Sequence, residues 1–147
     1  VRGERLISEP GFFEGMMATA LAPDELLLDT RLPLLGADTR AGFNKFNRRA
    51  GDFAQAMSVV VYRLQNGVIV EPRIGVGAVE AAPRRIAVAE ALLAGQKPST
   101  ALFEAAAAAA AENVEPIDQG SDTAAYKRDL VRAVVARALA AAESNHE

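Results

Sequence analysis

Two neighbouring stretches in the middle of the chain are rich in apolar residues. Residues 53–64 become β-branched towards their end and predict a strand. Asn66 and Gly67 follow, and this dipeptide between two apolar runs predicts a tight hairpin, because both residues tolerate the positive φ of a type I′ turn. Residues 68–79 form the expected return strand. Pro72 within it predicts an edge position or a bulge, since proline has no N–H to offer a strand partner.

A third extended segment is predicted to begin at Gly42, ahead of the hairpin. Phe43 and Phe46 within it do not fit strict alternation, so a bend or bulge is expected between them. In the return strand, Gly75 and Gly77 alternate with apolar residues and leave one face bare. A bare strand face is typical of a position that accepts a helix or another backbone at close range.

The last third of the chain has the 3.6-residue period of helices. A first helix is predicted to begin near Pro83 and to end at Gly95. Ser99 is a good N-cap for a second helix, which contains the alanine run 105–111. A third helix is predicted over residues 122–142. Turn-forming residues separate the second and third helices: Pro116, Asp118, Gly120 and Ser121.

The N-terminal segment is less regular. Phe12 and Phe13 follow a Pro-Gly pair and predict a turn and then a buried aromatic anchor. Residues 22–25 combine proline with acids, as the first turn of a helix does. The leucine-rich residues 26–32 then predict a short strand that ends at Pro33, and the alternative is a strand throughout this segment. Extended segments therefore precede helices, which predicts an α+β fold: a small, about three-stranded antiparallel sheet packed on one face by a three-helix layer.

Composition and charge remove several classes of function. The chain of 147 residues is half apolar, so it can bury a core. Its net charge of −3 argues against nucleic-acid binding, which requires a basic surface. The sequence has no cysteine, which excludes disulfides, Fe–S clusters and cysteine-based zinc sites on this chain and fits a cytoplasmic protein. No apolar run reaches the roughly 18–20 residues that span a bilayer.

Several candidate chemical groups have a structural explanation. Gly75 and Gly77 superficially resemble a phosphate loop, but they lie within a predicted strand and the third glycine of that motif is absent. His146 is the single histidine, so neither a metal site nor a serine–histidine pair is expected. No residue of the chain is predicted to be catalytic.

The strongest candidate for chemistry is the charged cluster ahead of the hairpin, which consists of Lys45, Arg48, Arg49 and Asp52. In one interpretation these residues are solvated charges on an edge strand, where they discourage sheet-to-sheet pairing. In the other they face an anionic or electron-accepting ligand, and Asp52 holds one of the cations in a fixed orientation. Chemistry alone leaves both interpretations open.

Four segments carry a family resemblance across nearly the whole chain, in both their order and their spacing. They are PGFFEGMMATALAPDELLLDTRLP at 10–33, FNKFNRRAGDFAQAMSVVV at 43–61, RIGVGAVEAAPRRIAVAEALLAG at 73–95 and AYKRDLVRAVVARAL at 125–139. Each motif is weak alone. Together they resemble the C-terminal part of the flavoprotein (medium) subunit in the carbon monoxide dehydrogenase and xanthine dehydrogenase family of molybdenum hydroxylases.

The resemblance implies an FAD subunit of an oxidoreductase whose partner subunits carry molybdopterin and iron–sulfur clusters. Residues 1–38 then correspond to the tail end of an upstream FAD domain and the crossover segment, and residues 39–147 to the flavoprotein C-terminal domain. The glycine-rich loops for the FAD pyrophosphate would lie upstream, so the chain is expected to be a fragment that is inactive alone. The rival hypothesis is a non-enzymatic protein-interaction or dimerisation module, formed by the helices and the alanine-rich face.

The resemblance also assigns roles within the charged cluster. Phe43 stands where relatives often have a tyrosine near the isoalloxazine ring, and Lys45 matches the family's lysine. Arg48, Arg49 and Asp52 match its basic pair and acid. A cation near the N1–C2 carbonyl edge of the flavin favours the anionic reduced form and so raises the flavin's potential. Lys45 is the first candidate for that contact.

Overall fold

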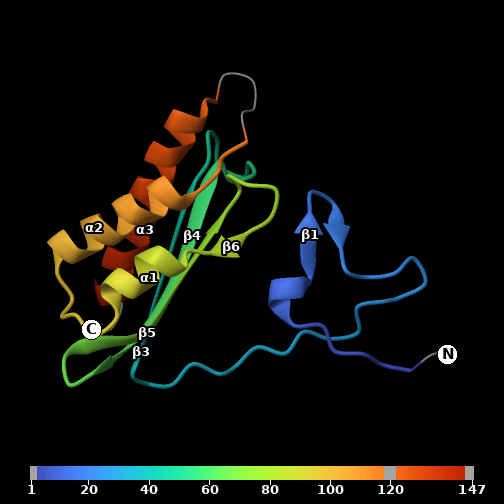
Figure 1. Cartoon of the computed structure of the whole chain (residues 1–147), viewed down its shortest axis with the longest axis horizontal. Helices are drawn as coiled ribbons and strands as arrows, with labels where there is room; N and C mark the ends of the chain where they lie inside the picture. The colour runs from blue at the N-terminus through green and yellow to red at the C-terminus, as the bar shows by residue number, and fades with distance from the viewer. Residues whose placement is uncertain (1–2, 118–121, 145–147) are drawn as a thin grey trace.

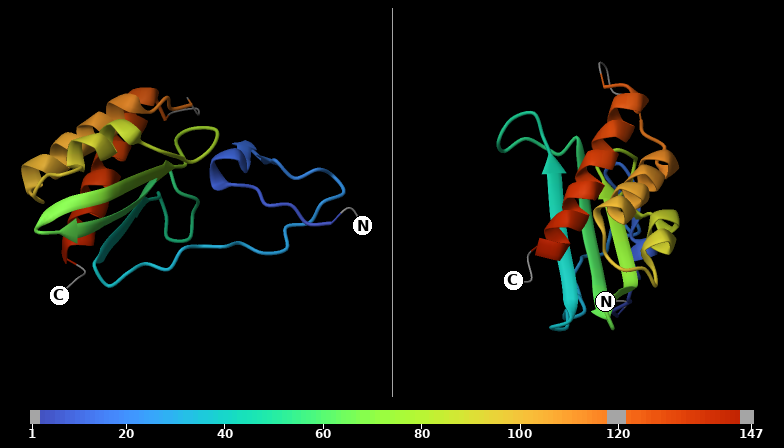
Figure 2. Two further views of the ribbon diagram at one scale, coloured as in Figure 1. Left: turned by 60° about the horizontal axis from the view of Figure 1, so that its bottom comes forward. Right: turned by 90° about the vertical axis from the view of Figure 1, so that its left-hand side faces the viewer.

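The computed structural model describes residues 3–117 and 122–144, and this part of the chain has an α+β architecture. Its strands form an antiparallel sheet in the order β3-β4-β5-β6, with the helices on one face (Figure 1, Figure 2). The strands are β3 (Thr39–Phe46), β4 (Ala56–Gln65), β5 (Val68–Gly77) and β6 (Arg84–Arg85). The helices are α1 (Ala87–Leu93), α2 (Thr100–Asn113) and α3 (Ala124–Ser144). The predicted fold class is confirmed, with the short β6 added to the three expected strands.

Burial follows the two-residue period of the strands. Val60 and Tyr62 in β4 are fully buried against the helices, whereas Val59 is 49% exposed on the opposite face. Phe43 is exposed and Phe46 is half-buried against the core, and β3 pairs with β4 in unbroken register between them. The predicted bend is therefore wrong. Two rings three positions apart lie on opposite faces of a regular strand.

The predicted hairpin and its irregularity are confirmed. Asn66 and Gly67 have φ of 54° and 76°, as a type I′ turn requires. Further along β5 the pairing shifts register, so Glu71 and Pro72 lie together opposite one residue of β4, with Glu71 at φ 51°. Beyond β5, β6 pairs only near Gly75, which leaves Pro72 at an unpaired edge.

A glycine allows β3 and α3 to approach closely. A Cβ at Gly42 would overlap the carbonyl oxygen of Ala138 and lie 2.7 Å from the amide nitrogen of Ala142. The same test at Gly75 finds only the carbonyl oxygen of Val59, at 3.7 Å. The bare face of β5 was expected to accept a helix or another backbone, but the described helices pack on the other face. The close approach is at Gly42 instead.

The first helix begins later than predicted, because the residues after Pro83 have strand partners. Arg85 pairs with Gly75 in β6 and also binds the buried Glu90 carboxylate, with nitrogen–oxygen distances of 2.6 and 2.9 Å. Glu90 in turn accepts the backbone N–H of Ile74 at 2.9 Å, so the start of α1 is fastened to β5. The helix still ends near Gly95, whose φ is 76°.

The other two helices are close to prediction. The Ser99 hydroxyl accepts the N–H of Leu102 at 3.2 Å and caps α2. Four alanines of the run in α2 are buried in the core, so its alanine-rich row is used inside the domain: Ala106, Ala107, Ala110 and Ala111. Helix α3 spans 124–144 against the predicted 122–142. The predicted turn residues Asp118, Gly120 and Ser121 lie outside the described residues.

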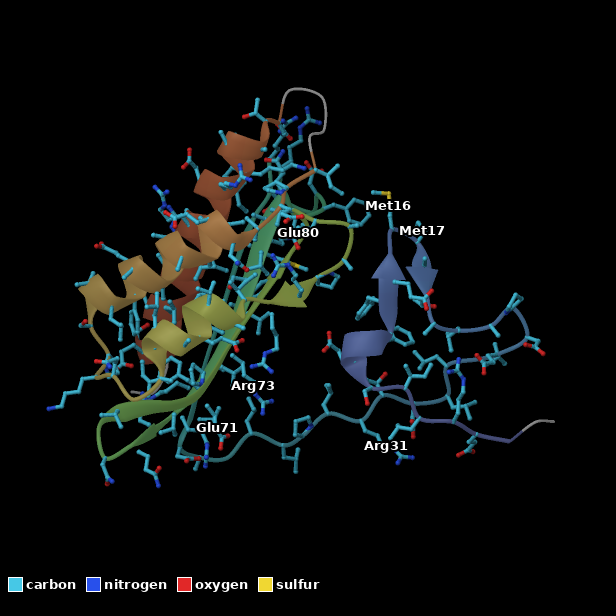
Figure 3. All side chains as sticks on the ribbon, viewed as in Figure 1. Met16, Met17, Arg31, Glu71, Arg73 and Glu80 are labelled. Atoms are coloured by element: carbon cyan, nitrogen blue, oxygen red, sulfur yellow. The ribbon has the colours of Figure 1, made fainter. Side chains whose placement is uncertain are left out.

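Residues 3–38 form an arm beside the domain (Figure 1). The arm contains η1 (Glu9–Gly11) and a two-stranded sheet of β1 (Phe13–Gly15) and β2 (Ala18–Thr19). Met16 and Met17 stand at the turn between these strands, 69% and 102% exposed (Figure 3). Phe13 contacts Phe12 edge to face at 5.1 Å and is itself 46% exposed, so no described residue buries the predicted anchor.

The rest of the arm is extended and has no strand partner. Residues 22–25 form a single turn, closed by the N–H of Glu25 and the carbonyl of Ala22 at 2.9 Å. The strand predicted over 26–32 is wrong, because no described segment pairs with it. The leucines of this stretch and those just after it are exposed: Leu26, Leu27, Leu28, Leu32, Leu34 and Leu35.

Candidate functional site

The candidate residues lie on the outer face of β3 and on the loop of residues 47–55 that joins β3 to β4. Phe43 and Lys45 are two positions apart on one strand, so both side chains lie on the face without helices. Phe43 is 56% exposed. Arg48, Arg49 and Asp52 are exposed residues of the loop. The five candidate residues therefore lie close together along the chain, two on the open face of the sheet and three in the loop at the end of β3.

Register extends this outer face across the sheet. Phe43 pairs with Val59, Val59 with Gly75, and Gly75 with Arg85. The next row out joins Lys45 to Met57 and Met57 to Gly77. Between Lys45 at one edge and Arg85, which is paired with Glu90, at the other, these rows consist of apolar residues and glycine.

Backbone hydrogen bonds shape the loop. The N–H of Gln55 donates to the carbonyl of Phe46 at 2.8 Å and closes its base, and the N–H of Asp52 donates to the carbonyl of Arg49 at 3.1 Å. Lys45 Nζ reaches the backbone carbonyl oxygen of Asp52 at 3.4 Å. The expectation that the Asp52 carboxylate holds a cation is wrong, because no ion pair joins it to a described residue.

Asp122, just before α3, supplies the carboxylate that the loop uses. Its Oδ1 lies 2.5 Å from Arg48 Nη2, and its Oδ2 accepts a hydrogen bond from Gln55 Nε2 at 2.8 Å. The Asp122 side chain is 16% exposed, whereas that of Arg48 is 58% exposed. The sequence pattern indicates this residue only as the start of a helix. Asp122 and Arg48 are 74 positions apart, and no local signal links them.

An open hollow of about 250 Å³ lies at the loop. Its lining residues are Arg48, Asp52, Phe53 and Gln55. Phe53 was predicted to begin the strand, but it lies in the loop and is 98% exposed. An aromatic ring this exposed is available for stacking or for docking.

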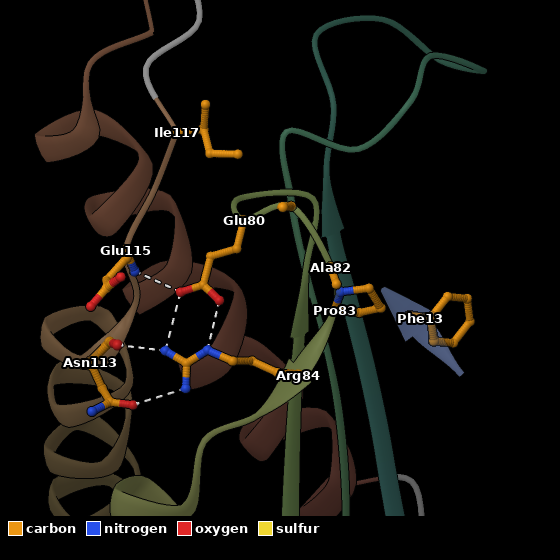
Figure 4. Close-up of a pocket in the computed structure, with 9 residues that line it drawn as sticks. Phe13, Glu80, Ala82, Pro83, Arg84, Asn113, Glu115 and Ile117 are labelled. Atoms are coloured by element: carbon orange, nitrogen blue, oxygen red, sulfur yellow. Dashed lines mark hydrogen bonds and ion pairs between the residues drawn. The ribbon is translucent and has the colours of Figure 1, made fainter. Parts of the chain in front are cut away.

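A second hollow, of about 730 Å³, separates Phe13 of the arm from the loop before β6 (Figure 4). Arg84 binds both carboxylate oxygens of Glu80, at 2.6 and 3.1 Å, and also the backbone carbonyl of Asn113 at 2.6 Å. Burial would raise the pKa of Glu80, but the hydrogen bonds from Arg84 and from the backbone N–H of Glu115 outweigh it and lower that pKa. This paired cluster fastens the end of α2 to the sheet.

Other kinds of site find little support. Gly75 and Gly77 lie inside β5, so their structural interpretation is confirmed and they form no phosphate loop. Among the described residues, no group of three or more histidine, cysteine or acidic side chains is arranged to hold a metal ion. In the same part of the chain, no helix has the length and apolarity needed to cross a membrane.

Comparison with known proteins shows the family to which the chain belongs. The family model described as the CO dehydrogenase flavoprotein C-terminal domain matches residues 41–142, which include β3, the loop and all three helices. The molecule is thus a flavoprotein domain of α+β type. The chain belongs to the CO dehydrogenase flavoprotein C-terminal domain family.

Two curated relatives that the chain matches are the medium subunits of a hydroxylase and a dehydrogenase. The nicotine 6-hydroxylase medium subunit of Paenarthrobacter nicotinovorans is 32% identical over 95% of this chain and 48% of its own length. The carbon monoxide dehydrogenase medium chain of Hydrogenophaga pseudoflava is 31% identical over 95% of this chain and 49% of its own length. The chain therefore spans about half the length of these relatives.

Solved structures agree with the sequence comparison. Carbon monoxide dehydrogenase from Hydrogenophaga pseudoflava matches with a TM-score of 0.86 and 34% identity, over 92% of this chain and 47% of that chain. Quinoline 2-oxidoreductase from Pseudomonas putida 86 matches with a TM-score of 0.85 and 27% identity, over 93% of this chain and 48% of that chain. Both matches extend over most of the chain, the arm included in part.

Proposed function

We propose that this chain is the C-terminal domain of the FAD subunit of a molybdenum-containing hydroxylase or dehydrogenase. It helps to cover the flavin and to dock the partner subunits while electrons pass from an iron–sulfur subunit through FAD to an acceptor. The observation that carries the proposal is the family match over residues 41–142, which includes the exposed Phe43 and Lys45 on β3. Substrate oxidation belongs to the molybdopterin subunit in this proposal.

The residues present fit one part of FAD. An exposed aromatic ring and nearby cations suit a planar, electron-accepting ring system that becomes more negative on reduction. The described residues offer no glycine-rich turn before a helix for the pyrophosphate, and the hollow at the loop is open and small, about 250 Å³. FAD is therefore held mainly by the half of the relatives' length that this chain does not span.

Within the proposed site each residue has a physical role. FAD, when bound, supplies the capacity to accept and release electrons. Lys45 presents an ammonium group that stabilises negative charge on the ring and so raises its potential, while the carbonyl of Asp52 limits its freedom. The ring of Phe43 covers apolar surface and excludes water. Arg49 adds a second cation, because its guanidinium has no ion-pair partner among the described residues.

The arm supports the proposed division into two parts, with residues 1–38 belonging to an FAD domain and its crossover and residues 39–147 forming the C-terminal domain. A run of leucines that remains exposed leaves substantial apolar area in water, at about 25 cal/mol per Å². Packing against an upstream FAD domain would remove that area. The molybdopterin and iron–sulfur subunits are the proposed further partners, in a cytoplasmic complex.

A comparison of two lysine variants in the complete flavoprotein tests the proposal. Lys45→Ala should weaken binding of oxidised FAD about tenfold and binding of reduced FAD about tenfold more than that. This difference between the two redox states lowers the midpoint potential of the two-electron couple by about 30 mV. Lys97→Ala is the matched control, since Lys97 is exposed in the connection between α1 and α2. A complete protein that purifies without flavin, or equal behaviour of the two variants, contradicts the proposal.

The isolated 147-residue chain offers a second test. It should bind FAD weakly or not at all, because the pyrophosphate-binding part is not among its described features. Titration with FAD, followed by flavin fluorescence, measures this. A saturating curve in the micromolar range would show that the chain holds a complete site. The upstream reading frame discriminates against the rival interaction module, which predicts an unrelated domain there instead of glycine-rich FAD loops.

A further inference from the structure

One carboxylate fastens the loop of residues 47–55 to the domain near both ends of the loop. Arg48 and Gln55, at the two ends of the loop, both bind Asp122, at 2.5 and 2.8 Å. A further described contact joins Lys45 Nζ to the carbonyl of Asp52 at 3.4 Å, which is long for a hydrogen bond. In Figure 1 the loop and the start of α3 lie at the same end of the sheet.

The helix behind this carboxylate is a firm reference point. Asp122 lies two residues before α3, which packs along β3 and β4. Close contact at Gly42 fixes the far part of the helix against the sheet. Asp122 is 16% exposed, so its oxygens face the loop rather than solvent. A contact with Asp122 therefore holds the loop in a fixed position relative to the packed core.

The contact with Asp122 distinguishes the two adjacent arginines, Arg48 and Arg49. Arg48 is neutralised by Asp122, whereas the guanidinium of Arg49 has no ion-pair partner in the described part of the chain. An ion pair with an arginine this exposed is screened by solvent and adds little to global stability. The principal effect of this ion pair is to orient the loop, because the Asp122 carboxylate bridges the two loop ends, with one oxygen on Arg48 and the other on Gln55.

We propose that Asp122 is a positioning residue for the flavin-facing loop, and that Arg48 is its tether rather than a flavin ligand. The inference rests on the proposed function of this chain. Asp122 orders the loop and thereby places Lys45, Arg49 and Phe53 toward the ring. Arg48 thus differs from Arg49 although the two are adjacent in the sequence.

The test uses the complete flavoprotein and measures the loop and the flavin separately. Asp122→Asn should accelerate amide hydrogen exchange in residues 47–55 about tenfold in the FAD-free protein and weaken FAD binding about fivefold. Asp129→Asn is the matched control, because Asp129 lies on α3 itself, is 72% exposed and is 4.0 Å from Arg132. Asp122→Glu should restore part of the protection, since a carboxylate is retained.

Arginine variants test the division of the basic pair. Arg48→Gln should reproduce both effects of Asp122→Asn, and the double variant should add nothing further. Arg49→Gln should weaken FAD binding without changing exchange in the loop. The unfolding midpoint of each variant is recorded, so that general destabilisation is separated from local loosening of the loop.

Three results decide the matter. If Asp122→Asn behaves as Asp129→Asn does, or loosens the loop without changing FAD affinity, the inference is overturned while the proposed function stands. If the wild-type flavoprotein binds no FAD, or Lys45→Ala matches Lys97→Ala, the proposed function fails and the inference fails with it. Faster exchange together with weaker FAD binding in Asp122→Asn and Arg48→Gln supports the inference.

Discussion

The arm and the domain use the same apolar residue types with opposite results. Leu93 and Leu139 in the domain are fully buried, whereas Leu26 and Leu34 in the arm are 84% and 98% exposed. The difference is the presence of a partner surface. Helical and strand periods place the domain's leucines on faces that meet other faces of the same chain, while the arm runs past the sheet without a described segment to pack on.

The largest expected effect comes from a matched pair of leucines. Leu139→Ala should lower the free energy of unfolding by about 2–5 kcal/mol, because it leaves a cavity in a packed core. Leu34→Ala should change it by no more than about 0.5 kcal/mol in the 147-residue chain. Urea unfolding of both variants measures the contrast. Equal losses would show that the arm is packed as firmly as the domain.

A matched pair of glycines gives the next effect. Gly42→Ala should destabilise the domain by about 1–3 kcal/mol, since the new methyl group overlaps the backbone of α3 at Ala138. Gly75→Ala should be nearly neutral, because its nearest neighbour would be 3.7 Å away on the open face. Thermal unfolding followed by circular dichroism distinguishes them. A tolerated Gly42→Ala would contradict the described approach of helix and strand.

Acid should weaken the fastening between α2 and the sheet. The pKa of Glu80 is lowered by Arg84 and Glu115, so its carboxylate contributes stability above the unfolded-state value near 4.5 and loses it as pH falls through the folded value. Glu80→Gln should cost about 1–2 kcal/mol at pH 7, and this difference from wild type should shrink below about pH 4.5. Unfolding free energies at pH 7, 5 and about 3.5 measure it. A constant difference would mean that the carboxyl charge plays no part.

The smallest effect should follow removal of the arm. Deleting residues 1–35 should alter the unfolding free energy of the domain by less than about 1 kcal/mol, because the arm meets it chiefly where Phe13 faces Pro83 across an open hollow (Figure 4). In the complete flavoprotein the leucines of the arm should instead be protected from solvent.

Amide hydrogen exchange over residues 24–35 is compared between the undeleted 147-residue chain and the complete flavoprotein. Equal exchange in these two proteins would contradict a partner surface upstream.

The features predicted correctly from the sequence are local ones. Asn66 and Gly67 fix the hairpin through their own φ preferences, Pro72 marks its bulge, and Ser99 caps α2 through a contact three residues away. These features need only neighbouring residues. Their physical cause is visible in a short stretch of sequence.

Several of the errors concern contacts between separate segments. The predicted start of the first helix at Pro83 failed because Arg85 pairs with Gly75 and binds Glu90. At the site, the sequence indicated the cluster of charges but not the acid that holds it. Asp122 is 74 positions from Arg48, and its role follows only from the packing of α3 on the sheet. Propensity and motif spacing carry no such information.

Helix α3 and the residues just before it contact the sheet and the charged loop at two separate places. Ala138, near the C-terminal end of the helix, packs against the backbone at Gly42, and Asp122, just before the helix, binds Arg48 of the loop. The two points are about 24 Å apart along the helix axis, at 1.5 Å per residue. A side chain that pushes the helix outward at Gly42 would therefore swing the loop as well. The packing of α3 at Gly42 and the orientation of the charged loop are therefore expected to change together.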